Sequence, residues 1–313
     1  MQRKTVSRLP TFIVVGPPRT ATTWLDKALR RHVGLPDKTK ETLFFARNYG
    51  KGFAWYMKHF RRCASDQVVG EICAAYFENP QARERIHASL PGCKIICTLR
   101  DPVERLYSYY KLMRHNGQTE LSFEDAVFRH DKMLASSRYA SLLREWHNLF
   151  GAENVLVALN DDLVADSQTY LDRITDFIGT SRITVPQSLA TRNRENTIET
   201  APRSAWLARR GRSFRSWLGS HQFYRTRTFF DRRGVWRFCS EGGERFLPLD
   251  HALKYRLQQL LESEIEQLEE LIGRDLANWK GTRAEEVQVG HSGKGSYNRG
   301  RDYCTLRREI PER

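Results

Sequence analysis

The stretch TFIVVGPPRTATTWL, residues 11–25, decides the fold. It begins with the uninterrupted apolar run Phe12–Val15, which is typical of a β-strand buried on both faces of a parallel sheet. Gly16–Pro18 ends this strand, and a helix is predicted to begin near Thr22. A strand, a glycine-containing turn and a helix in this order present backbone N–H groups to an anion. We therefore predict an anion-binding turn at 16–23.

The same alternation of strand and helix continues along the chain. Three further strands are predicted at 68–72, 94–99 and 154–159. Helices are predicted at 79–90, 101–116, 139–150, 169–178 and 255–272, with a short one capped by Ser122. This order predicts an α/β fold, a P-loop-like three-layer sandwich with a central parallel sheet flanked by helices.

The chain is predicted to have three parts. An N-terminal extension at 1–10 precedes a single domain at 11–280. A flexible C-terminal tail is expected at 281–313, because that end is polar and contains many Gly and Ser residues. Within the domain, 182–247 is rich in arginine and aromatic residues and has no clear helix or strand pattern.

Composition limits the classes of function. The chain has 313 residues and a formal net charge of +14, so it can bury a sizeable core and is expected to meet an anionic partner. Its six cysteines form no CxxC pair, which argues against a zinc site. Cys73 and Cys97 lie in apolar runs and are predicted to be reduced core thiols. With no signal peptide and no transmembrane segment in the sequence, we expect a cytoplasmic location.

The turn differs from the phosphate-binding loop of nucleoside triphosphatases, G-x-x-x-x-G-K-[ST]. Gly16 and Thr23 match the ends of that loop, but Ala21 replaces the second glycine. Thr22 replaces the lysine that would hold the β- and γ-phosphates of ATP, and the cation stands three residues earlier, at Arg19. The turn therefore predicts phosphate binding by an arrangement other than that of an ATPase.

A second stretch, LRDPVERLYSYY at 99–110, follows the predicted strand 94–99. Arg100 leaves the carboxyl edge of that strand, where ligands of open α/β sheets bind, and Ser108 lies about two helical turns later. A guanidinium and a hydroxyl suit a phosphate dianion. This stretch and RTATTWL at 19–25 resemble the two phosphate-binding motifs of sulfotransferases that use 3′-phosphoadenosine 5′-phosphosulfate (PAPS).

The resemblance covers about 11–280 and is weakest over 182–247. It implies that PAPS is the co-substrate and 3′-phosphoadenosine 5′-phosphate (PAP) the product. The turn would hold the 5′-phosphosulfate, and the second motif, with a loop that closes over it, would hold the 3′-phosphate. The implied donor-binding residues are Pro18, Arg19, Thr20, Ala21, Thr22, Thr23, Trp24, Arg100, Ser108 and Arg192.

The segment KETLFFARNY at 40–49 resembles the heparan sulfate branch of the family. That resemblance implies that Glu41 is the catalytic base, while Arg19 stabilises charge on the leaving oxygen. The stretch GRDL at 273–276 resembles the ending of bacterial members, so a bacterial-type protein is expected. The residues predicted to contact the acceptor are Phe45, Tyr76 and His115.

Two features depart from the heparan sulfate branch. Ile72 stands where glycan-acting members often have a lysine, and no cysteine pair is placed to close the disulfide loop that they carry late in the domain. Both features weaken the assignment of a heparan-like acceptor without affecting the sulfotransferase class.

The motifs predict transfer of a sulfuryl group from PAPS to a hydroxyl or amine by in-line displacement. No metal is required in principle, because a sulfuryl group carries less charge than a phosphoryl group. The Glu41 segment favours a carbohydrate or glycoconjugate acceptor, and a small-molecule or lipid alcohol stays open. Two other classes stay open, a P-loop nucleotide kinase and a nucleic-acid-binding protein that uses the basic, aromatic run 203–233. For the enzyme we expect no nucleic-acid partner and at most a weak homo-oligomer.

Overall fold

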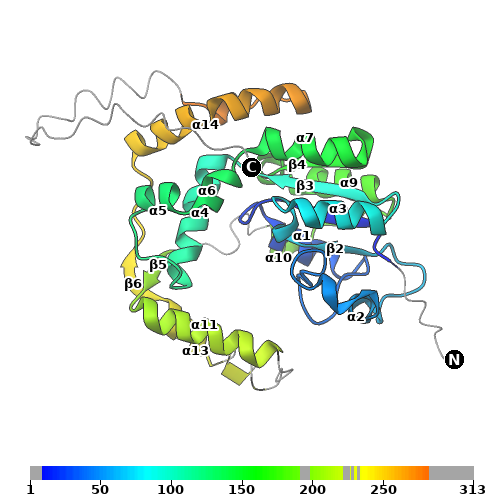
Figure 1. Ribbon diagram of the computed structural model, residues 1–313, viewed down its shortest axis with the longest axis horizontal. Coiled ribbons are helices and arrows are strands. Elements are labelled where there is room, and N and C mark those ends of the chain that lie inside the picture. The colour runs from blue at the N-terminus through cyan, green and yellow to red at the C-terminus, as the bar shows by residue number, and fades with distance from the viewer. Residues whose placement is uncertain (1–8, 191–197, 221–225, 227–228, 231–232, 282–313) are drawn as a thin grey trace, which may run out of the picture.

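A four-stranded, all-parallel sheet forms the centre of the protein in a computed structural model of the chain (Figure 1). The structure describes residues 9–190, 198–220, 226, 229–230 and 233–281. The strand order is β2-β1-β3-β4. The strands are β1 (Phe12–Val15), β2 (Gly70–Ile72), β3 (Lys94–Leu99) and β4 (Val155–Leu159).

Helices cover both faces of this sheet. Because side chains alternate along a strand, Ile13 and Val15 enter one apolar core while Phe12 and Val14 enter the other. The core that contains Ile13 is completed by α3 (Pro80–Ser89), α4 (Pro102–His115), α7 (Tyr139–Phe150) and α14 (His251–Ile272). The opposite core is completed by α1 (Thr22–Leu29), α8 (Asn160–Ala165) and α9 (Ser167–Ile178). The predicted three-layer α/β fold is confirmed.

Capping residues start several of these helices where the sequence predicts. The Asp101 carboxylate accepts hydrogen bonds from the backbone N–H groups of Val103 and Glu104, so it caps α4. The Ser122 hydroxyl likewise accepts from the N–H of Asp125 at the start of a short helix. The Asp101 cap fixes where α4 begins, directly after β3.

The region 182–247, whose sequence shows no clear helix or strand pattern, contains a second small sheet and a pair of helices. Strands β5 (Thr200–Pro202) and β6 (Gly242–Arg245) pair antiparallel, and α11 (Ala205–Ser220) and α13 (Val235–Ser240) pack together. Figure 1 shows α11 and α13 beyond the end of α4, away from the central sheet. Gly117, just after α4, allows this packing, because a Cβ atom there would lie 2.3 Å from the carbonyl oxygen of Ala205.

The remaining elements are short. They are α2 (Phe53–Met57), α5 (Phe123–Arg129), α6 (Asp131–Ala135), α10 (Gln187–Ala190) and the 3₁₀ turns Tyr49–Lys51, Lys58–Phe60, Ala74–Tyr76, Ala152–Asn154 and Ala277–Trp279. None of the helices in the described ranges is long and apolar enough to cross a bilayer. The described cysteines are unpaired, and Cys73 and Cys97 are buried as predicted. Residues 1–8 and 282–313 lie outside the described part, so the predicted extension and tail stay predictions.

Gly70 provides a test of how tightly the sheet packs. A Cβ atom at this position would lie 2.3 Å from the ring of the fully buried Phe12. We expect Gly70→Ala to lower the free energy of unfolding by about 1–3 kcal/mol through overpacking, measured by urea denaturation. Gly50→Ala is the matched control, because its Cβ would meet nothing within 4 Å. Equal unfolding midpoints for the two variants would contradict this account.

Candidate functional site

The turn after β1 has the backbone shape of an anion site. Gly16 lies against β3, where a Cβ atom would come within 2.3 Å of the Thr98 hydroxyl oxygen. Arg19 and Ala21 both adopt positive φ angles, of 82° and 64°, which side-chain-bearing residues seldom do. Such turns direct successive N–H groups to one point. Ala21 is also the N-cap of α1 and supplies no side-chain cap, so the first N–H groups of that helix remain available to a ligand.

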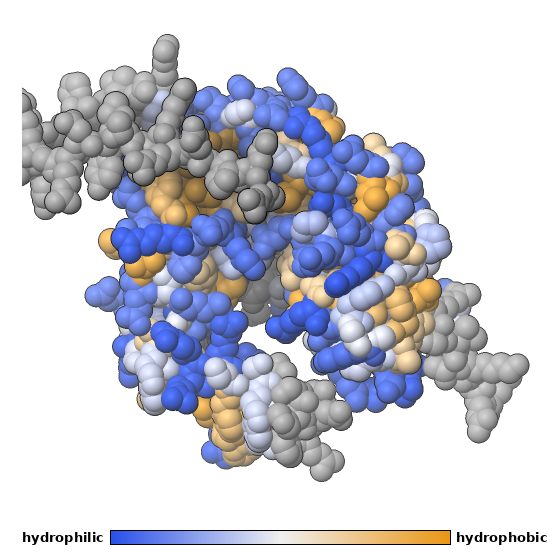
Figure 2. Space-filling model, in the orientation of Figure 1, coloured by the Kyte–Doolittle hydropathy of each residue, from blue (hydrophilic) through white to orange (hydrophobic). Residues whose placement is uncertain are grey.

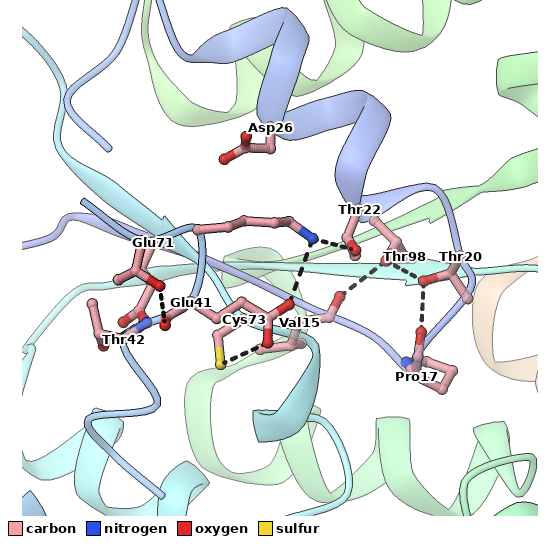
Figure 3. A network of polar contacts seen from close by, with 12 residues as sticks. Val15, Pro17, Thr20, Thr22, Asp26, Glu41, Thr42, Glu71, Cys73 and Thr98 are labelled. Carbon is pink, nitrogen blue, oxygen red and sulfur yellow. Dashed lines mark hydrogen bonds and ion pairs between the residues drawn. The ribbon is translucent and has the colours of Figure 1, made fainter. Parts of the chain in front are cut away.

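Thr20 holds this turn in shape. Its side chain is buried, its hydroxyl donates to the Pro17 carbonyl at 2.9 Å, and it contacts the Thr98 hydroxyl at 2.7 Å (Figure 3). Only the backbone of Thr20 is therefore placed to contact a donor. The side chain of Trp24 is 3% exposed in the opposite core, and its indole N–H donates to the carbonyl of Leu189. Of Trp24, which is expected to bind the donor, only the backbone N–H in the first turn of α1 is therefore placed to do so.

Cations from two motifs converge beside the turn. The Arg19 Nε donates to the Ser108 hydroxyl at 2.8 Å, although the two residues are 89 positions apart. Burial lowers the pKa of Arg19, and the nearby charge of Arg100 lowers it further. Arg100 itself lies 3.6 Å from Glu104, one turn into α4. The two predicted phosphate motifs are thus brought together around a space that favours an anion.

Lys111 joins this group, and sequence reasoning missed it. Burial lowers its pKa most, Glu104 opposes that effect, and Arg100 and Arg19 lower it further. The signal available in the sequence was spacing, because Lys111 follows Ser108 by three residues and so lies on a neighbouring part of the same helix face. We refer to Arg19, Arg100, Ser108 and Lys111 as the phosphate cluster.

Glu41 lies on the far side of the turn from the phosphate cluster. Lys40 connects it to the turn, since its Nζ donates to the Thr22 hydroxyl at 2.9 Å and lies 3.5 Å from Glu41 Oε1. The side chains of Lys40 and Glu41 are 27% and 30% exposed, so a ligand can reach both. Figure 3 shows Glu41 between Cys73 and the side of α1 that carries Thr22.

A buried carboxylate fixes the segment that carries Glu41. Glu71 is fully buried and accepts hydrogen bonds from the Thr42 N–H at 2.8 Å, the Thr42 hydroxyl at 2.6 Å and the Tyr56 hydroxyl at 2.8 Å. Tyr76 adds a longer bond at 3.3 Å. Burial raises the pKa of Glu71, while these hydrogen bonds oppose the rise. Because Thr42 directly follows Glu41, this network sets where the exposed carboxylate stands.

Two predicted acceptor contacts are wrong as direct contacts. Phe45 and Tyr76 are fully buried, and the Tyr76 hydroxyl is bound to Glu71. They form the floor beneath the Glu41 segment, where Phe45 makes edge-to-face contacts with the rings of Phe44 and Tyr76. His115 does line a groove, at the end of α4. Arg192 lies outside the described residues.

Figure 2 shows the molecule hollowed between the part that contains α4, α11 and α13 and the part that contains α1 and α2, with hydrophilic residues along both sides. A sequence model described as "Sulfotransferase domain" matches residues 9–233. This range is more than half of the chain and includes the turn, the Glu41 segment and the phosphate cluster. The chain belongs to the sulfotransferase domain family.

Known relatives agree with that assignment. Heparan sulfate glucosamine 3-O-sulfotransferase 6 of Homo sapiens is 32% identical over 184 residues, which are 56% of this chain and 54% of that protein. Bifunctional heparan sulfate N-deacetylase/N-sulfotransferase 4 of Mus musculus is 30% identical over 201 residues, 57% of this chain and 23% of that protein. The chain therefore spans about half, or less, of the length of these relatives.

A crystal structure of a sulfotransferase from Alicyclobacillus acidocaldarius shares the fold, with a TM-score of 0.63 at 20% identity over 87% of this chain and 99% of that one. The predicted resemblance to PAPS-dependent sulfotransferases related to the heparan sulfate branch is confirmed. The bacterial type stays a prediction.

The Glu71 network of this sulfotransferase domain gives a graded prediction. Glu71→Met would leave the N–H and hydroxyl donors around it without an acceptor, so we expect the free energy of unfolding to fall by about 3 kcal/mol or more. Glu71→Gln should cost only about 1 kcal/mol, since hydroxyls can rotate and accept from the amide. Urea denaturation measures both. A Met variant as stable as the Gln variant would show that the network does not hold the segment.

Asp101 predicts a pH effect on stability. Burial raises its pKa to about 6, while the N–H groups it caps oppose the rise. Below about pH 4 the Asp101 carboxyl is protonated in both the folded and the unfolded chain. Between about pH 4 and 6 this carboxyl is ionised in the unfolded chain but still largely protonated in the folded one. The free energy of unfolding therefore falls as pH rises through this range. Asp101→Asn keeps the cap without titrating. Relative to that variant, the wild-type chain should lose about 2 kcal/mol between pH 4 and 7, and parallel stability curves would contradict the assignment.

Proposed function

We propose that this sulfotransferase domain transfers a sulfuryl group from PAPS to a hydroxyl or amine of a carbohydrate acceptor. One observation carries the proposal: a cluster of partly buried cations and a partly exposed carboxylate lie on either side of the same anion-binding turn. The names of the relatives add support, because both act on heparan sulfate. Glycans of that type are the first acceptors to test, before small-molecule or lipid alcohols.

In this proposal the donor binds along the edge of the sheet. Arg100 and Ser108 would hold the 3′-phosphate, where a guanidinium fork and a hydroxyl suit a dianion. The backbone N–H groups of the turn, together with Thr22 and Thr23, would hold the 5′-phosphosulfate. Arg19 lies between these two places, since it bonds to Ser108 and belongs to the turn.

The reaction follows from that placement. Glu41 takes the proton of the acceptor hydroxyl as the acceptor oxygen bonds to sulfur, and the bond between sulfur and the phosphate oxygen breaks. Arg19 stabilises the negative charge that builds on the leaving phosphate. Lys40, which contacts both Thr22 and Glu41, places a further charge beside the transferred group. Positioning and electrostatics thus supply most of the rate, by analogy with phosphoryl transfer.

A nucleotide kinase is the competing proposal, and ligand-induced stabilisation separates the two. We expect PAP at about 100 times its dissociation constant to raise the free energy of unfolding by about 2.7 kcal/mol without any metal. Mg·ATP should have no effect, because Thr22 replaces the lysine that would hold its phosphates. Thermal melting with each ligand tests this, and stabilisation by Mg·ATP alone would favour the kinase.

Glu41→Gln tests the base. The change keeps shape and hydrogen-bonding reach but removes the proton acceptor, so we expect kcat to fall by about 10²- to 10⁴-fold with PAP affinity unchanged. Steady-state transfer from labelled PAPS and calorimetry with PAP provide the two measurements. Glu270→Gln, at an exposed position on α14, is the control. Near-normal turnover of the Glu41 variant would remove this residue from the role.

A further inference from the structure

A groove lies where the end of α4 meets α11 and α13. Its volume is about 250 Å³, and the residues that line it include His115, Arg212, Arg215, Trp236, Arg237 and Glu241. Sites that enclose whole drug-sized ligands measure roughly 300–1,000 Å³. The groove is therefore of a size to hold one group of a larger molecule.

The lining of the groove favours negative charge. Three arginines face a single lining carboxylate, Glu241, and that carboxylate lies 3.3 Å from Arg237. Arg215 lies over the ring of Trp236, with its guanidinium carbon 5.9 Å from the ring centre. A guanidinium that rests on an aromatic ring is oriented in advance to bind an oxyanion beside an apolar surface.

Two buried polar atoms of the lining residues have no hydrogen-bond partner among the described residues. They are Nδ1 of His115 and Nε1 of Trp236. Buried polar groups are nearly always paired, so each such exception requires an explanation.

Helix α4 connects the groove to the phosphate cluster. His115 follows Ser108 by seven residues, which is about two turns along the same helix face and about 10 Å. The charge of Arg19 also reaches His115: burial lowers the pKa of His115 most, Glu241 opposes that effect, and Arg19 lowers the pKa further. A molecule that reacts beside Arg19 can thus reach the groove with a neighbouring unit.

We propose that this groove binds a carboxylate or sulfate carried by the acceptor, about 10 Å along α4 from Ser108. The inference rests on the proposed function and sharpens it: the acceptor is an acidic saccharide, and neutral glycans and lipid alcohols are poor substrates. Selection for the acidic group would come from α11 and α13, outside the donor site.

Binding to the full chain saturated with PAP tests the groove without depending on turnover. The probe is a six-sugar chain of alternating glucuronic acid and N-acetylglucosamine, whose carboxylates make it acidic. Calorimetry compares it with a neutral form, in which the carboxyl groups are reduced, and with an N-sulfated version of that neutral form, which is acidic again. We expect the wild-type protein to prefer an acidic form. The double variant Arg212→Gln, Arg215→Gln should bind that form about 10- to 100-fold more weakly, because one or two charge-assisted hydrogen bonds are lost. Its binding of the neutral form should not change.

The control removes the same charge elsewhere. Arg210→Gln with Arg245→Gln changes two exposed arginines that do not line the groove, and it should bind the probes as the wild type does. PAP affinity shows that each variant is folded. Equal binding of acidic and neutral forms, no binding of either acidic form, or equal losses in both double variants would overturn the proposal. Failure of sulfuryl transfer to every acceptor, with groove-dependent binding intact, would instead count against the proposed function.

Discussion

The fully buried carboxylate of Glu71 organises the site. Glu71 sits in the core on β2, where only hydrogen bonds can compensate the loss of hydration. Its donors come from the loop after α1, from α2 and from the turn after β2, so one side chain ties three separate segments to the edge of the sheet. Glu41, which directly follows Lys40 and precedes Thr42, is positioned by this network together with its own contacts to Lys40 and Cys73.

The other half of the site is organised by α4. One end of this helix carries Arg100 and the Asp101 cap, its middle carries Ser108 and Lys111, and its last turn carries His115. The cap fixes where the helix begins, and the helical repeat then fixes every later position. Ser108, which is proposed to bind a phosphate, and His115, which lines the groove, are thus held on one helix at a set separation.

The sequence predicted those features that local rules control. An apolar run, a glycine and two capping residues were enough for the sheet, the anion turn and the start of α4, because each depends on neighbours in the chain. Phe45 and Tyr76 were predicted as acceptor contacts and are buried instead, because a motif names a residue but not whether its side chain enters the core. The hydrogen bond between Arg19 and Ser108 joins segments 89 positions apart, and α11 carries exposed aromatic residues in place of a regular apolar stripe. Neither feature has a local signature.

Gly117 has a consequence for how such a protein can change over time. The backbone of α11 approaches α4 so closely there that no side chain fits, and Arg209 adds a hydrogen bond to the Gly117 carbonyl at 3.1 Å. The attachment of α11 at this point therefore depends on two positions, Gly117 and Arg209. Side chains farther along α11 are free to diversify while the attachment and the donor site stay constant. Descendants of one ancestral donor-binding core could in this way acquire different acceptors by altering a single appended helix.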